Sequence, residues 1–158
     1  MRILRISSMT FTLSLMLASS AALAQGIVNH VSVGGHDQDP AGNTDANFSL
    51  VANLHSDGSV TGQWTDQFGQ GQGGFHAQVN CVSVAGNEAW VAGVITSGTF
   101  AGASLVGLPV ITHVQDNGKS ANDPPDAISF SFIGNPADCT TQPVLALFPM
   151  TDGQVTVR

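Results

Sequence analysis

The chain has 158 residues with 11 acidic and 4 basic side chains, and its formal net charge is −7 at pH 7. Clusters of Lys and Arg bind phosphate backbones and anionic lipids, so this composition excludes nucleic acid and anionic membrane surfaces as expected partners. The length suits a single domain with its own hydrophobic core.

Residues 1–24 have the pattern of a secretory signal peptide. Arg2 and Arg5 precede an apolar run over residues 11–17, and Ala22-Leu23-Ala24 matches the small-residue pattern of a cleavage site. A retained membrane anchor is the alternative, but Ser and Thr interrupt the run, which is short for a span. We predict cleavage after Ala24, one domain over residues 25–158, no membrane span after cleavage, and a periplasmic or secreted protein.

The first half of the exported chain is predicted to form short strands separated by turns. A short apolar strand over residues 27–33 is followed by a polar loop over 34–45. Residues 48–55 alternate between apolar and polar side chains, which is the period of a half-buried strand, and a turn leads to a further strand over 59–65. A glycine-rich stretch over 67–74 follows.

The most regular part of the sequence is a hairpin over residues 75–96. Phe75, Ala77, Val79 and Cys81 alternate with polar residues, and Ala85-Gly86-Asn87-Glu88 favours a tight turn. The strand over 89–96 is apolar on both faces, so we expect it in the middle of a sheet, covered on both sides.

The second half is predicted to contain shorter strands and longer loops. Strands are expected over residues 99–107, 108–115, 127–133, 144–148 and 154–157. The fold class is therefore all-β: an antiparallel β-sandwich or small barrel of about 8–10 strands. The side chains expected to be largely buried are Phe48, Leu50, Trp64, Val79, Val91, Ile128, Phe130 and Phe132.

Cys81 and Cys139 are the two cysteines of the chain. Cysteines of an exported protein pair in an oxidising compartment, so we predict a disulfide between them. Closing this long loop stabilises the fold by roughly 4 kcal/mol at most in the chain-entropy description. Because Cys81 alternates in phase with Val79, its sulfur is expected to point into the core.

Parts of the sequence resemble a family of small secreted bacterial β-rich proteins. The matching segments are Val79-Asn80-Cys81-Val82-Ser83-Val84, Gly86-Asn87-Glu88-Ala89, Gly93-Val94-Ile95 and Val114-Gln115-Asp116-Asn117-Gly118, with Asp126 ahead of Ile128-Ser129-Phe130. The resemblance covers about half of the exported chain and implies an exported all-β domain. It transfers no catalytic residue.

The polar loop after the first strand is the candidate metal site. Its oxygen-bearing side chains fall at liganding positions of a calcium loop: Asp37, Asp39, Asn43 and Asp45. The last position of an EF-hand loop is a bidentate carboxylate, whereas Phe48 stands there in this chain, so calcium would need a non-EF site. The alternative is a solvated turn rich in Asp and Gly.

A second polar cluster contains Asp116, Asn117, Asp123 and Asp126. Asp and Asn side chains in turns commonly accept hydrogen bonds from neighbouring backbone, and this role is favoured over an ion site.

Two classes of function remain open. The first is an exported binding or structural module with calcium as its candidate ligand. The second is a hydrolase of small esters or lactones in which calcium or a histidine activates water. Its candidate catalytic residues are His36, His76 and His113, with Asp37 and Asp39. Convergence of three such side chains in one concavity would favour the enzyme, and dispersal would favour the module.

Overall fold

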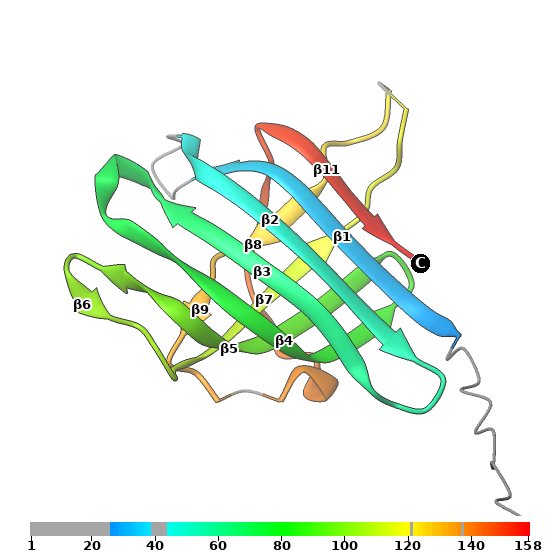
Figure 1. Cartoon of the computed structure of the whole chain (residues 1–158). Coiled ribbons are helices and arrows are strands. Elements are labelled where there is room, and N and C mark those ends of the chain that lie inside the picture. The colour runs from blue at the N-terminus through cyan, green and yellow to red at the C-terminus, as the bar shows by residue number, and fades with distance from the viewer. Residues whose placement is uncertain (1–25, 39–43, 121, 137) are drawn as a thin grey trace, which may run out of the picture.

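The structure, a computed structural model, describes residues 26–38, 44–120, 122–136 and 138–158, without the side chains of residues 37, 38 and 44–46. The described residues form one eleven-stranded antiparallel sheet (Figure 1). Its strands are β1 (Ile27–Gln38), β2 (Thr44–His55), β3 (Val60–Phe68), β4 (Gly73–Ala85), β5 (Glu88–Phe100), β6 (Ala103–Ser104), β7 (Pro109–Gln115), β8 (Ala127–Ser129), β9 (Phe132–Ile133), β10 (Leu147–Pro149) and β11 (Asp152–Val157). Two short 3-10 turns, η1 (Gly69–Gly71) and η2 (Cys139–Thr141), lie between strands.

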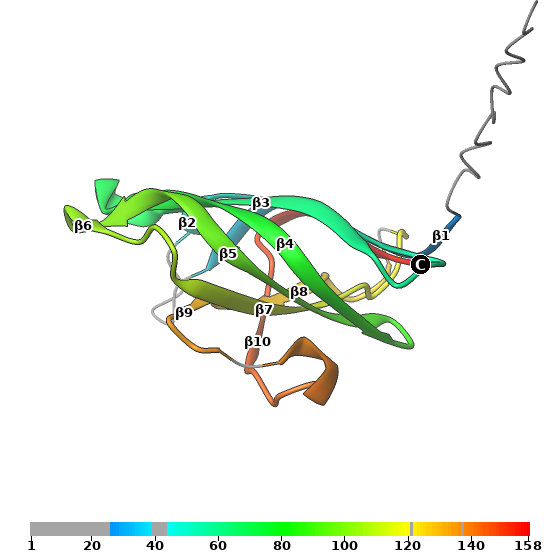
Figure 2. The same cartoon turned by 60° about the horizontal axis from the view of Figure 1, so that its bottom comes forward.

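The sheet is curled, so that its two ends face each other. The strand order is β10-β8-β7-β5-β4-β3-β2-β1-β11, and β11 returns from the end of the chain to pair with β1. Figure 2 shows β7 and β8 lying beneath β1, β2 and β3, with β4 and β5 bending between the two layers. The predicted all-β antiparallel class is confirmed. Of the two predicted architectures, the structure is closer to the barrel, because one curled sheet forms a half-barrel.

Glycines make the sharp curl possible. Gly35 pairs directly with Phe48, and Gly98 pairs with Phe75. At Gly98 φ is +139°, and an added Cβ would stand 2.3 Å from the carbonyl oxygen of Gly74. A side chain is therefore excluded there, and the facing phenylalanine supplies apolar cover beside the bare backbone.

The main core fills the space inside the curl. Trp64 packs between Phe48 and Phe75, with ring centroids 5.6 and 5.2 Å away. Six of the eight side chains predicted to be largely buried are so: Phe48, Leu50, Trp64, Val79, Val91 and Ile128.

Phe130 and Phe132 are only half-buried, so this part of the predicted core is wrong. The predicted strand over 127–133 divides into β8 and β9, and the interruption breaks the alternation of faces. Ser129 is buried, and its hydroxyl accepts a hydrogen bond from the backbone N–H of His113 at 2.9 Å.

A second apolar cluster lies on the outer face of β5 and β7. It contains Trp90, Ala92, Ile111 and Cys139, and the segment 138–145 covers it. Trp90 donates its indole N–H to the carbonyl of Pro143 at 2.9 Å. β5 is thus covered on both sides at this end, as its doubly apolar sequence predicts.

The disulfide between Cys81 and Cys139 is confirmed, with the two Cα atoms 6.0 Å apart. The expected direction of Cys81 is wrong, because the register shifts between Val79 and Cys81. One extra residue turns every following side chain to the opposite face. Cys81 therefore packs with the outer cluster, and the bond fastens the segment 138–145 over it.

Removing the disulfide should loosen this cover before it affects the inner core. We expect the double variant Cys81→Ser/Cys139→Ser to lose at most about 4 kcal/mol of unfolding free energy. Acrylamide quenching of Trp90 fluorescence should increase, measured in a Trp64→Phe background. Mass spectrometry of the unreduced parent protein should show the mass lowered by two hydrogens, and two free thiols would contradict the pairing.

The predicted loop over residues 34–45 is largely strand. β1 continues to Gln38 and β2 begins at Thr44, with Gln38 and Thr44 paired across the hairpin. Polar residues and glycines misled the prediction, because a long two-stranded extension can expose both faces to water. Within the described part of the chain, no helix has the length and hydropathy that a membrane span requires.

Candidate functional site

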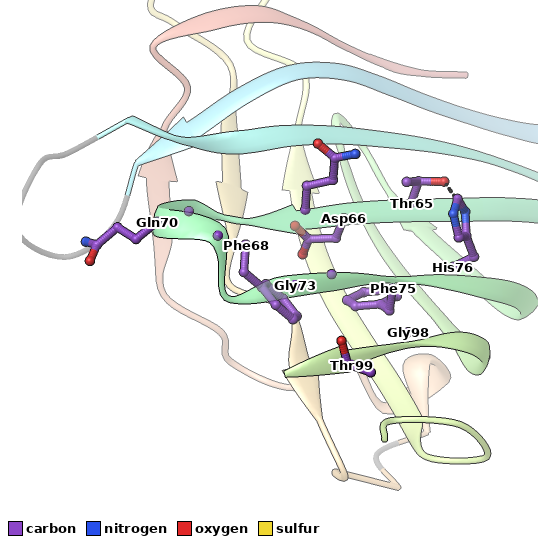
Figure 3. Close-up of a pocket in the computed structure, with 13 residues that line it drawn as sticks. Thr65, Asp66, Phe68, Gln70, Gly73, Phe75, His76, Gly98 and Thr99 are labelled. Carbon is purple, nitrogen blue, oxygen red and sulfur yellow. Dashed lines mark hydrogen bonds between the residues drawn. The ribbon is translucent and has the colours of Figure 1, made fainter. Parts of the chain in front are cut away.

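A cavity of about 590 Å³ lies around the glycine-rich end of the β3–β4 hairpin. Figure 3 shows its walls, which come from the end of β3, the turn η1, the start of β4 and the end of β5. Gly73, Gly74 and Gly98 line it without side chains. Backbone is therefore accessible where other residues would fill the space.

The polar walls of this cavity are preorganised. Thr65 and His76 face each other across β3 and β4, with the hydroxyl and Nδ1 2.9 Å apart (Figure 3). The Thr96 hydroxyl donates to the carbonyl of His76 at 3.1 Å, which ties the same position to β5. A hydroxyl and an imidazole in fixed orientation can orient a polar ligand.

Asp66 also lines the cavity, but it is a buried side chain on the other face of β3. The Ser131 hydroxyl donates to the Asp66 carboxylate from the break between β8 and β9. This bond links the two layers of the curl beside the phenylalanines Phe68 and Phe75. Asp66 therefore has a structural role at the cavity wall.

A second trough of about 350 Å³ adjoins the first on β2 and β3. It lies over Gly62 and is lined by Ser49, Val51, Gln63 and Thr65. Thr65 lines both cavities, so the two are neighbours, and we call them together the outer groove.

The three candidate catalytic histidines lie on separate parts of the sheet. His36 is near the end of β1, where its Nδ1 is 2.7 Å from Asp152; this hydrogen bond lowers the pKa of the Asp152 carboxyl. His76 lines the outer groove, and His113 lies on β7 under the segment 138–145. Within the described part of the chain, these three histidines do not converge in one concavity. The arrangement that would favour a hydrolase is therefore not found among them.

His113 belongs to a packed cluster rather than an open site. Its ring stacks on Trp90 with centroids 4.1 Å apart, and Nε2 lies 2.9 Å from a carboxylate oxygen of Glu88. The other Glu88 oxygen accepts from the Gln115 amide at 3.0 Å. Ser129 bonds the backbone of His113, not its ring, so these residues do not form a nucleophile–base pair.

The second acidic cluster closes the seam of the curled sheet. Asp126 accepts from the backbone N–H of Asn117 at 2.7 Å and of Val155 at 2.6 Å. Asp116 accepts from the N–H of Val157 at 3.0 Å. Two carboxylates thus bond the free edge of β11 in the way a neighbouring strand would, which agrees with the structural role favoured over an ion site.

One group of potential metal-binding residues is found in the described part of the chain: Cys81, Asp138 and Cys139. Its two sulfurs form the disulfide, so they are not available as thiolate ligands. Asp138 accepts from the backbone N–H of Thr140 at 2.9 Å, and this bond lowers the pKa of its carboxyl. The Asp138 carboxylate therefore caps the turn η2.

The predicted calcium site lies outside the described residues in its essential parts. Asp39 and Asn43 are not described, and Asp37 and Asp45 are placed only as backbone of β1 and β2. Calcium binding there stays a prediction. If it occurs, excess calcium should raise the melting temperature, because a ligand that binds only the folded state stabilises it.

The test of the calcium site compares melting curves with excess calcium and with chelator. The variant Asp37→Asn/Asp39→Asn should lose the calcium-dependent increase, whereas Asp57→Asn, in the exposed turn between β2 and β3, should keep it. An unchanged melting temperature of the parent protein in excess calcium would contradict the prediction.

The outer groove is not predicted from the sequence. Residues 67–74 stand out there only as a glycine-rich stretch, whereas in the structure β3 continues to Phe68 and β4 begins at Gly73. The signal in the sequence that could have indicated the groove is the high density of glycines between the polar residues Thr65 and Gln67 on one side and His76 on the other. No motif assigns a ligand to this pattern.

No protein family, curated protein or solved structure matches this chain.

Proposed function

We propose that the chain is an exported all-β binding module whose ligand occupies the outer groove. The observation that carries the proposal is the glycine-lined cavity of about 590 Å³ with its fixed Thr65–His76 pair. Its volume falls in the range of small-molecule sites, which are concave and carry a few oriented polar groups.

The distribution of titratable groups favours binding over hydrolysis. Activation of water needs a base within hydrogen-bond reach of the reacting atoms and a second group for the developing charge. In the outer groove, His76 bonds Thr65, and the Asp66 carboxylate is buried against Ser131. His36 and His113 lie on other strands with carboxylate partners of their own.

The proposal is tested by NMR titration of the ¹⁵N-labelled chain over residues 25–158 with a set of small neutral, charged and apolar fragments. We expect at least one class of fragment to shift the amides of Thr65, Gln67 and His76. Amides of β7 and β11 serve as internal controls and should stay unchanged. If no fragment shifts the groove amides at millimolar concentration, the proposed binding function is wrong.

A further inference from the structure

Among the side chains that the structure describes, from residue 47 onward, the outer face of β2, β3 and β4 is uncharged and mostly polar. The outward positions there are Asn47, Ser49, Val51, Asn53, His55, Thr61, Gln63, Thr65, Gln67, His76, Gln78 and Asn80. None of these is Asp, Glu, Lys or Arg, although the chain contains 11 acidic residues. The acidic side chains described above lie instead in turns, at the seam or inside the curl. The outer groove crosses this uncharged face.

The groove offers groups that both donate and accept hydrogen bonds. The side chains of Gln63, Gln67 and Thr99 line it. All three residues are exposed, so their amide and hydroxyl groups are accessible to a ligand. An amide or a hydroxyl can donate to one ligand group and accept from another. Hydroxyl groups of a ligand have the same double capacity, so the two sets complement each other.

Ligands of other chemistry fit the groove poorly. An anionic ligand would lose part of its hydration without meeting a Lys or Arg side chain in the lining, which is costly. An apolar ligand would cover the exposed amides of Gln63 and Gln67 and leave them without water or a partner. The floor is formed at Gly62 and Gly74, where no side chain blocks a ligand that lies along the sheet.

We infer that the outer groove binds a neutral, hydroxyl-rich chain of the oligosaccharide class. The inference rests on the proposed binding function and adds the chemical class of the ligand. Two adjoining depressions that share Thr65 suit an extended ligand better than a compact one. Hydrogen bonds supply the main contacts, because the outward side chains along the groove are mostly polar.

The probes are three neutral trisaccharides, maltotriose, cellotriose and triacetylchitotriose, with trigalacturonate as the charged comparison. We expect at least one neutral trisaccharide to shift the amides of Thr65, Gln67 and His76 in a saturable way. Trigalacturonate should bind at least about tenfold more weakly, because the groove supplies no positive charge.

The matched variants are Thr65→Val and Thr156→Val. Both replace a hydroxyl by a methyl group on a strand, but Thr156 lies on β11 outside the groove. Loss of one hydrogen-bonding group in the groove should weaken trisaccharide binding roughly three- to tenfold in Thr65→Val and leave Thr156→Val unchanged. Melting curves of both variants verify that they are folded.

The outcomes separate this inference from the proposal on which it rests. Binding of charged or apolar fragments in the groove, with no response to the neutral trisaccharides, overturns the oligosaccharide class and leaves the binding module intact. No response of the groove to any fragment overturns both. A trisaccharide that binds equally to the parent and to Thr65→Val binds elsewhere and also overturns the inference.

Discussion

Replacing Asp126 by Ala should destabilise the fold by about 2–5 kcal/mol, because two backbone donors lose their partner at once. The Asp126 carboxylate is buried and accepts from Asn117 and Val155, so it holds the β7–β8 loop and the edge of β11 together. Denaturant unfolding measures the loss. Hydrogen exchange of the Val155 amide should accelerate more than exchange of core amides in β4.

The neighbouring Asp123 provides the control for this prediction. It is exposed and accepts from the backbone N–H of Ser120 at 2.8 Å within its own loop. We expect Asp123→Ala to cost less than about 1 kcal/mol, since a lost partner there is replaced by water. The loss of unfolding free energy in Asp126→Asn should lie between those of Asp123→Ala and Asp126→Ala. One side-chain oxygen of the asparagine still accepts a hydrogen bond, while its NH₂ group faces the second backbone donor. Equal losses for Asp123→Ala and Asp126→Ala would show that the seam does not depend on Asp126.

Truncation of Trp64 should have the largest effect in the core. Trp64 is fully buried between Phe48 and Phe75, and Trp64→Ala should cost about 3–5 kcal/mol through lost apolar burial and the cavity left behind. Its indole N–H is buried and has no hydrogen-bond partner among the described residues. Trp64→Phe should therefore cost clearly less, because it removes an unsatisfied donor and keeps a ring in place.

Phe130→Ala is the comparison for the core prediction. Phe130 is half-buried beside Phe148, with ring centroids 4.7 Å apart. Less apolar area is removed from water at this position, so its truncation should cost less than that of Trp64. Denaturant curves of the three variants, analysed with a common m-value, test the order. A loss for Phe130→Ala as large as that for Trp64→Ala would contradict the assigned burial.

Local pattern was sufficient for the central strands and for most of the core. The alternation around Leu50, Trp64 and Val79 predicts which face is buried, because a strand places successive side chains on opposite sides. Gly86 in a tight turn predicts the β4–β5 hairpin, and φ there is +64°. Pairing of Cys81 with Cys139 follows from the presence of two cysteines in a chain expected to be exported.

Local pattern was misleading wherever the sheet departs from regular pairing. A single bulge near Cys81 turns its side chain to the outer face, and the break after Ser129 removes Phe130 and Phe132 from the inner core. Such irregularities depend on how the partner strand fits, and the partner is distant in the sequence. The prediction of face from period alone therefore fails after each of them.

The sequence by itself determined the all-β class, the central hairpin, six buried residues and the disulfide, since each depends on neighbouring residues or on residue identity alone. Only the tertiary structure decided the curl of the sheet, the seam and the outer groove. Asp126 contacts Val155 because the curl brings distant strands together, whereas Thr65 meets His76 through the register in which β3 pairs with β4. The same curl separates His36, His76 and His113. Spacing along the chain holds no information about those distances, because they are set by how the whole sheet twists and closes.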